Sequence, residues 1–64
     1  MKNKIKEMRK ATNTSQLALS QKVGVSRQTI NAIENNKYNP TLELAFDLAK
    51  ELKTTVDELF DASE

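Results

Sequence analysis

The sequence contains no cysteine and no histidine, and it has only one glycine and one proline. The lack of cysteine excludes disulfides and thiolate metal sites. The lack of histidine removes the commonest metal ligand and the side chain that titrates near neutral pH. The 64 residues form one domain, 1–64, and a domain of this size buries only about 60% of the surface that its unfolded chain exposes. Helix packing or oligomerisation must therefore supply its stability.

Long apolar runs are also missing. No run approaches the roughly 18 residues of a membrane span, and the basic start MKNKIKEMRK lacks the apolar stretch of a signal peptide. We therefore expect a cytoplasmic protein with no membrane partner. The sequence has no glycine-rich phosphate loop, paired acid–base site or metal cluster. We expect it not to be an enzyme and to need no cofactor, metal or small-molecule ligand.

The charges are unevenly distributed along the chain. Residues 1–37 carry eight Lys or Arg against two Glu, a net charge of +6, whereas residues 38–64 carry two Lys against seven Asp or Glu, a net charge of −5. A basic half and an acidic half suggest a polyanionic partner on one side of the protein. Chance clustering of solvated charges is the alternative.

Turn signals and apolar spacing predict five short helices, over about 3–11, 16–23, 27–34, 42–52 and 55–60. Hydroxyl residues that can cap helix N-termini precede or begin the last four: Ser15, Ser26, Thr41 and Thr55. Gly24 is expected to end the second helix in a left-handed turn, and Asn35–Asn36 the third. The last four residues are expected to fray. The predicted core contains Ile5, Met8, Leu19, Val23, Ile30, Ile33, Leu44, Ala45, Leu48, Ala49, Leu52 and Leu59.

About three residues around Gly24 join the second and third helices. So short a joint forces the two helices to cross steeply, which is the helix-turn-helix arrangement. With Ile30 and Ile33 turned inward, helical geometry places Arg27, Gln28 and Asn31 on the outside of the third helix. These side chains can either be presented to a groove of a ligand or form an ordinary solvated face.

The run SQLALSQKVGVSRQTINAIENNKYNPTLELAFDLAKEL resembles the small helix-turn-helix regulators of the phage-repressor/Cro and xenobiotic-response-element type. The residues that carry the resemblance are Gln16, Leu19, Gly24, Val25, Ser26, Ile30, Ile33, Glu34, Asn35, Lys37, Tyr38, Asn39 and Pro40, and the ending VDELF resembles the fifth helix of that family. The resemblance implies an all-α, compact five-helix, lambda-repressor-like domain with its helix-turn-helix at about 16–35. It also implies a homodimer that binds double-stranded DNA at a near-palindromic operator.

The resemblance also implies roles for individual residues. Bases would be read in the major groove by Arg27, Gln28, Thr29 and Asn31; phosphates would be contacted by Gln16, Ser26, Lys37, Tyr38 and Asn39. Arginine suits guanine and glutamine suits adenine as bidentate partners. Arg9 and Glu34 stand where such proteins often have an internal ion pair. Ser20 replaces the usual alanine, and its hydroxyl can bond back to a carbonyl.

Phe46 and Phe60, with Val56, are candidates for a dimer contact, because an exposed phenylalanine marks a self-association surface. Packing within one subunit is the alternative for each. The leading hypothesis for function is a sequence-specific transcriptional repressor. The competing hypothesis is a protein-interaction module on the same fold, such as an antitoxin or an anti-repressor, and an exposed Leu17, Phe46 or Phe60 would favour it.

Overall fold

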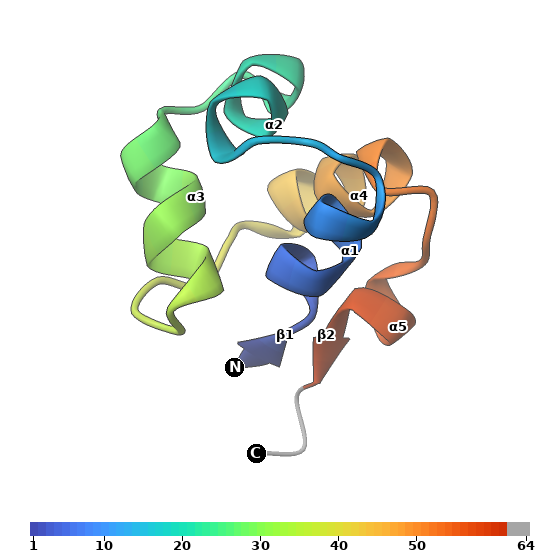
Figure 1. Ribbon diagram of the computed structural model, residues 1–64. Coiled ribbons are helices and arrows are strands. Elements are labelled where there is room, and N and C mark those ends of the chain that lie inside the picture. The colour runs from blue at the N-terminus through green and yellow to red at the C-terminus, as the bar shows by residue number, and fades with distance from the viewer. Residues whose placement is uncertain (62–64) are drawn as a thin grey trace.

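The computed structural model describes residues 1–61. Its elements follow one another as β1 (Lys2–Asn3), α1 (Ile5–Ala11), α2 (Gln16–Val23), α3 (Arg27–Glu34), α4 (Leu42–Glu51), α5 (Val56–Leu59) and β2 (Phe60–Asp61). Figure 1 shows α3 along one side of the molecule and α4 behind α1, with the two strands at the bottom. The five predicted helices are present, and the mostly helical fold class is confirmed.

The two short strands correct the sequence prediction at both ends. The first helix begins at Ile5 rather than at residue 3, and Phe60 belongs to β2 rather than to the fifth helix. The strands pair antiparallel, with Asn3 opposite Phe60, and the Lys4 amide extends the pairing by donating to the Leu59 carbonyl at 2.9 Å. Asp61, which was expected to fray, lies in β2; residues 62–64 lie outside the described residues.

Hydroxyl side chains cap four of the helices as predicted. Each accepts a hydrogen bond from the backbone N–H three residues later: Ser15 from Ala18, Ser26 from Thr29, Thr41 from Leu44 and Thr55 from Glu58, at 3.0 to 3.2 Å. Such a cap is typically worth about 1 kcal/mol. Local sequence therefore fixes where α2 to α5 begin.

Each of the helices α1 to α4 is followed, within two residues of its end, by a residue with positive φ. These residues are Asn13, Gly24, Asn36 and Lys53, with φ of 55°, 74°, 60° and 57°. In each case the next residue donates its N–H to the carbonyl five residues earlier, at 2.9 to 3.0 Å, as in a Schellman turn. The predicted endings at Gly24 and Asn36 are confirmed. The ending at Lys53 was not predicted, because a lysine rarely adopts the left-handed conformation.

The apolar faces of the helices meet in one core. It contains Ile5, Leu19, Ile30, Ile33, Leu44, Ala45, Leu48, Ala49, Leu52, Leu59 and Phe60, with Met8, Val23, Val25 and Val56 packed against its edge. The buried Ser20 donates its hydroxyl to the Leu17 carbonyl at 2.7 Å, which confirms the expected bond back to the helix. The core therefore holds α3 by its inner face and leaves its outer face exposed.

Candidate nucleic-acid interface

The turn between α2 and α3 presents the start of α3 to solvent. Gly24 has a left-handed backbone, and Val25, which donates to the Ser20 carbonyl, packs against the core. Ser26 then begins α3 as its cap, and Ile30 and Ile33 bury the inner face. Figure 1 shows that α3 crosses the direction of α2 instead of lying antiparallel to it. The N-terminal half of α3 therefore projects from the molecule.

Two long polar side chains stand at this projecting end. Arg27 and Gln28 are both exposed, and within residues 1–61 no hydrogen bond or ion pair engages either side chain. Arginine and glutamine are the side chains that pair bidentately with guanine and adenine edges. Their donors and acceptors are thus available to an external partner without breaking a contact inside the protein.

The other three candidates on α3 are partly engaged. The hydroxyls of Ser26 and Thr29 lie 3.0 Å apart, and Ser26 also caps the helix. The Asn31 side-chain oxygen accepts from the Asn35 amide at 3.3 Å. The amide nitrogen of Asn31 remains available to a ligand. To read a base, Thr29 and Asn31 must therefore either rearrange or form only a single hydrogen bond.

A shallow hollow of about 290 Å³ lies beside these residues. Its lining consists of Ser26, Gln28, Thr29, Ala32 and Tyr38. Sequence reasoning missed Ala32, although it stands one helical turn after Gln28 and therefore on the same face. The Tyr38 side chain comes from the loop that follows α3 and reaches the same surface. The loop and the helix together make one surface, which bears both base-reading and phosphate candidates.

The phosphate candidates lie at the edges of α3. Lys37, Tyr38 and Asn39 are exposed in the loop after α3, and Gln16 is half-buried at the start of α2. The Gln16 amide donates to Glu34 Oε1 at 3.0 Å, which ties the start of α2 to the end of α3. A helix start with free N–H groups suits a phosphate, and Gln16 retains its carbonyl oxygen and one N–H outside this bond.

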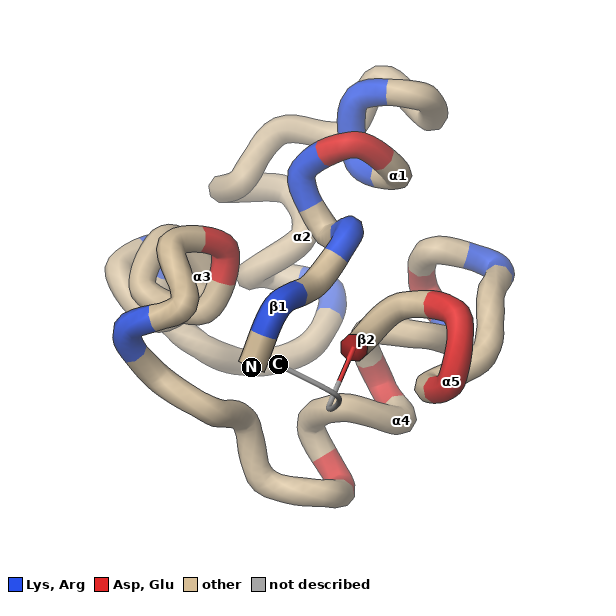
Figure 2. The backbone as a smooth tube through the Cα atoms, turned by 90° about the horizontal axis from the view of Figure 1, so that it is seen from below, with Lys and Arg blue, Asp and Glu red and all other residues tan. Residues whose placement is uncertain are grey.

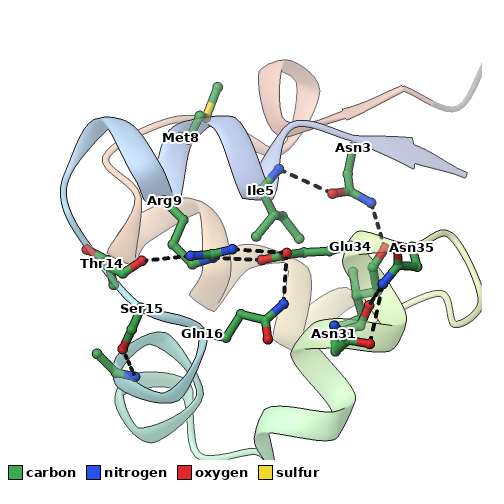
Figure 3. A network of polar contacts seen from close by, with 12 residues as sticks. Asn3, Ile5, Met8, Arg9, Thr14, Ser15, Gln16, Asn31, Glu34 and Asn35 are labelled. Carbon is green, nitrogen blue, oxygen red and sulfur yellow. Dashed lines mark hydrogen bonds and ion pairs between the residues drawn. The ribbon is translucent and has the colours of Figure 1, made fainter.

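Arg9 and Glu34 form a bidentate ion pair behind α3. Arg9 Nε lies 2.8 Å from Glu34 Oε2, and Arg9 Nη2 lies 3.2 Å from Glu34 Oε1. The Arg9 Nη1 donates to the Thr14 carbonyl at 3.0 Å, and the two side chains are only 10% and 4% exposed. Figure 3 shows Glu34 between Arg9 and Gln16, so one carboxylate joins α1, α2 and α3.

Asn3 makes a second link to α3 that the sequence did not predict. Its amide donates to the Ile33 carbonyl at 2.8 Å and to the Asn36 side chain at 3.3 Å. Its oxygen accepts from the Ile5 amide at 3.2 Å (Figure 3). Asn3 thus adds a second donor to a carbonyl at the end of α3 that already accepts the Asn36 N–H at 3.0 Å. The sequence separation of 30 residues between Asn3 and Ile33 leaves no local signal for this contact.

The basic and acidic halves are less separated in space than in sequence. Figure 2 shows basic residues along β1 and α1, with acidic residues on β2, α5 and α4. A groove of about 720 Å³ runs between β1–α1 and α5–β2, and its lining includes Lys2, Lys4, Glu7, Asp57 and Asp61. Opposite charges therefore neighbour each other at this end of the molecule. The cations at the expected DNA surface are Arg27 and Lys37.

The three dimer candidates differ in exposure. Phe60 is buried in the core at 8%, and Val56 packs partly buried against it, whereas Phe46 on α4 is 54% exposed. Leu42, one turn before Phe46, is 70% exposed and was not singled out from the sequence. Only Phe46, of the three, offers a large apolar surface to a partner.

Two findings concern other kinds of site. Among residues 1–61, no cluster of three or more His, Cys, Asp or Glu is arranged to hold a metal ion. None of the helices described is long and apolar enough to cross a membrane.

Comparison with known proteins identifies the family. The Helix-turn-helix family model matches residues 5–59. An uncharacterised HTH-type transcriptional regulator of Methanocaldococcus jannaschii is 50% identical over 60 residues, covering 94% of this chain and 91% of that protein. An uncharacterised HTH-type transcriptional regulator of Bacillus subtilis is 43% identical over 60 residues, again covering 94% of this chain and 91% of that protein.

Two solved structures share the fold. The restriction-modification controller protein C.AhdI from Aeromonas hydrophila superposes with a TM-score of 0.81 at 30% identity, over 88% of this chain and 85% of that one. A chain of the SinR protein/SinI protein complex superposes with a TM-score of 0.82 at 30% identity, over 94% of this chain and 59% of that one. The chain therefore belongs to the Cro/C1-type helix-turn-helix family and is a transcriptional regulator with a DNA-binding domain, not an enzyme.

Proposed function

We propose that this protein is a cytoplasmic repressor that binds a near-palindromic operator as a homodimer, with α3 of each subunit in the major groove. The observation that carries the proposal is the pair Arg27–Gln28, exposed at the projecting end of α3 and engaged by no side chain among residues 1–61. The hydrogen-bonding groups of these two side chains suit a guanine and an adenine in each half-site.

Phosphate contacts around α3 fix its position in the groove. Gln16 at the start of α2 and Lys37, Tyr38 and Asn39 after α3 flank the reading helix on both sides. Contacts of this kind position a protein on the duplex but carry no sequence information. They contribute the salt-dependent part of the affinity.

The size of the domain supports a dimer. The longest dimension of one subunit is 28 Å, whereas half-sites on one side of the duplex are about 34 Å apart. One subunit has a single α3 and reads one half-site, so a palindrome needs two copies. In the proposed dimer, the exposed Phe46 side chain lies in the contact between the two subunits. An operator that overlaps a promoter would then give repression by occlusion.

Selection of bound duplexes from a random library, at near-physiological salt, tests this function. We expect an enriched motif made of two inverted half-sites. The same selection with Arg27→Ala, and with the charge-matched Lys6→Ala on the exposed side of α1, separates base reading from loss of charge. Failure to enrich any motif, with only salt-sensitive background binding, would refute sequence-specific binding.

A protein-interaction module is the second candidate. Leu17 and Phe46 are 53% and 54% exposed, and the structurally similar SinR was solved in complex with another protein, SinI. Under this hypothesis the tight partner is a protein and DNA binding is secondary. A chain that enriches no DNA motif but binds one protein through Leu17 would support it.

A further inference from the structure

Asn3 connects two parts of the molecule that are far apart in the sequence. Its backbone lies in β1 opposite Phe60 of β2, and the neighbouring Lys4 N–H donates to the Leu59 carbonyl at 2.9 Å. Its half-buried side chain reaches the end of α3 (Figure 3). Main-chain pairing with β2 therefore holds Asn3 in place independently of what its side chain contacts.

The Asn3 amide contacts the turn that ends α3. It donates to the Ile33 carbonyl and to the Asn36 side-chain oxygen. Asn36 has a φ of 60° and turns the chain out of the helix. The N–H of the next residue, Lys37, closes this turn on the Ala32 carbonyl at 2.9 Å. One side chain from β1 thus holds the turn that leads directly to Lys37.

The other hydrogen bonds of this turn are local. Apart from the bond with Asn3, those that Asn35, Asn36 and Lys37 form within residues 1–61 run to residues of α3 itself. Lys37 and the following Tyr38 are exposed, so burial does not fix their positions. Without the Asn3 side chain, the direction of the chain after α3 would depend on the turn alone.

We infer that Asn3 is a positioning residue for DNA binding, which holds the turn after α3 so that Lys37 lies against a backbone phosphate. Asn3 acts through Asn36 and reduces the conformational freedom that the loop loses on binding. A phosphate contact carries no sequence information, so Asn3 affects the affinity for all duplexes alike and leaves base preference unchanged. The inference rests on the phosphate contact of Lys37 in the proposed function.

Asn3→Ser isolates this role. The Asn3 oxygen also accepts the Ile5 N–H at 3.2 Å at the start of α1, and a serine hydroxyl can keep that local bond. The shorter side chain has no amide group to reach the Ile33 carbonyl or the Asn36 oxygen. Asparagine and serine are both uncharged, so a change in the salt dependence of DNA binding cannot come from a change in net charge.

The decisive readout is the slope of log affinity against log salt, measured by fluorescence anisotropy with short duplexes between about 0.05 and 0.2 M salt. Lys37 is the only Lys or Arg between Arg27 and Lys50. Loss of its phosphate contact lowers the slope by about 0.9, and so weakens binding about fivefold at about 0.15 M salt relative to about 1 M. We expect this change for Lys37→Ala, and a loss of about two- to fivefold for Asn3→Ser, with the slope lowered in proportion.

The double variant tests whether Asn3 acts through Lys37. Once Lys37→Ala has removed the cation, Asn3→Ser should lower the slope no further, because the two residues contribute to one contact. A purely structural role for Asn3 would instead reduce the fraction of folded protein. That loss weakens binding by the same factor at every salt concentration and leaves the slope unchanged.

Controls exclude indirect effects. Gln21→Ser replaces an exposed, uncharged amide on α2 and should leave the slope unchanged. Circular dichroism shows whether each variant is folded at the assay temperature. If Asn3→Ser is not folded, Asn3→Thr gives the result, because threonine also keeps a hydroxyl and suits a strand.

Each outcome has a distinct meaning. An unchanged slope for Asn3→Ser, or a loss that adds to that of Lys37→Ala, would overturn the inference even if the unaltered chain selects an operator. An altered base preference for Asn3→Ser, or an unchanged slope for Lys37→Ala, would overturn it as well. A chain that selects no motif would refute the proposed operator. Its salt-sensitive binding to any duplex still tests Asn3, and a slope loss shared with Lys37 would then support the inference.

Discussion

Removal of the charge on Glu34 is expected to destabilise the whole domain. The Glu34 carboxylate accepts three hydrogen bonds, two from Arg9 at 2.8 and 3.2 Å and one from Gln16 at 3.0 Å. In Glu34→Gln only one side-chain oxygen remains, and the new amide group faces at least one of these donors. The Arg9 side chain is only 10% exposed. Its guanidinium then still donates a hydrogen bond to the Thr14 carbonyl but has no counter-charge.

The magnitude follows from burial. Breaking a buried ion pair by removing one partner costs about 3–5 kcal/mol, and we expect the lower end, about 3 kcal/mol, because glutamine keeps the shape of glutamate. A domain of 64 residues has a total free energy of unfolding of about 3–10 kcal/mol. Each kcal/mol corresponds to about 4–8 °C in the melting temperature at this size. Glu34→Gln should therefore melt at least about 12 °C lower, or be largely unfolded at room temperature.

Urea and thermal unfolding followed by circular dichroism measure the effect. Glu7→Gln removes an exposed carboxylate from α1 and should change stability by less than about 0.5 kcal/mol. Adding Arg9→Met to Glu34→Gln removes the uncompensated charge, so the double variant should be more stable than Glu34→Gln alone. A cost of Glu34→Gln below about 1 kcal/mol, or a double variant less stable than the single one, would refute this account of the pair.

Four other predictions concern binding and backbone conformation. Arg27→Ala should weaken specific binding by about 1–3 kcal/mol and relax the preference at one base pair, as read by duplex selection; an unchanged preference would make Arg27 a phosphate contact at most. Lys37→Ala should weaken binding to all duplexes alike and lower the slope of log affinity against log salt by about one, and an intact slope would remove Lys37 from the phosphate contacts. Lys53→Gly should raise the free energy of unfolding by about 0.5–1 kcal/mol, since Lys53 has a φ of 57°. Gly24→Ala should lower it by about 1 kcal/mol through backbone strain alone, because no described residue beyond Gly24 and its two chain neighbours comes within 4 Å of the added Cβ; equal stabilities in chemical unfolding would contradict both backbone predictions.

Much of the site could be predicted from short-range sequence signals. Ser26 and Gly24 fix the start of α3 and the turn before it, and Ile30 and Ile33 fix which face is buried, so the exposure of Arg27 follows from helical periodicity. These signals act within one or two helical turns and need no knowledge of the rest of the chain. The Arg9–Glu34 pair, by contrast, was expected only because the chain resembles a family in which such a pair is common.

The sequence by itself determined the boundaries of most helices, the inner and outer faces of α3 and the family. Only the tertiary structure decided the contacts between residues distant in the chain: the pairing of Asn3 with Phe60, the bond from Asn3 to the Ile33 carbonyl, and the burial of Phe60 rather than Phe46. Local periodicity tells which residues leave water together. It cannot tell which of two phenylalanines packs into the core, because that depends on how all the helices pack together.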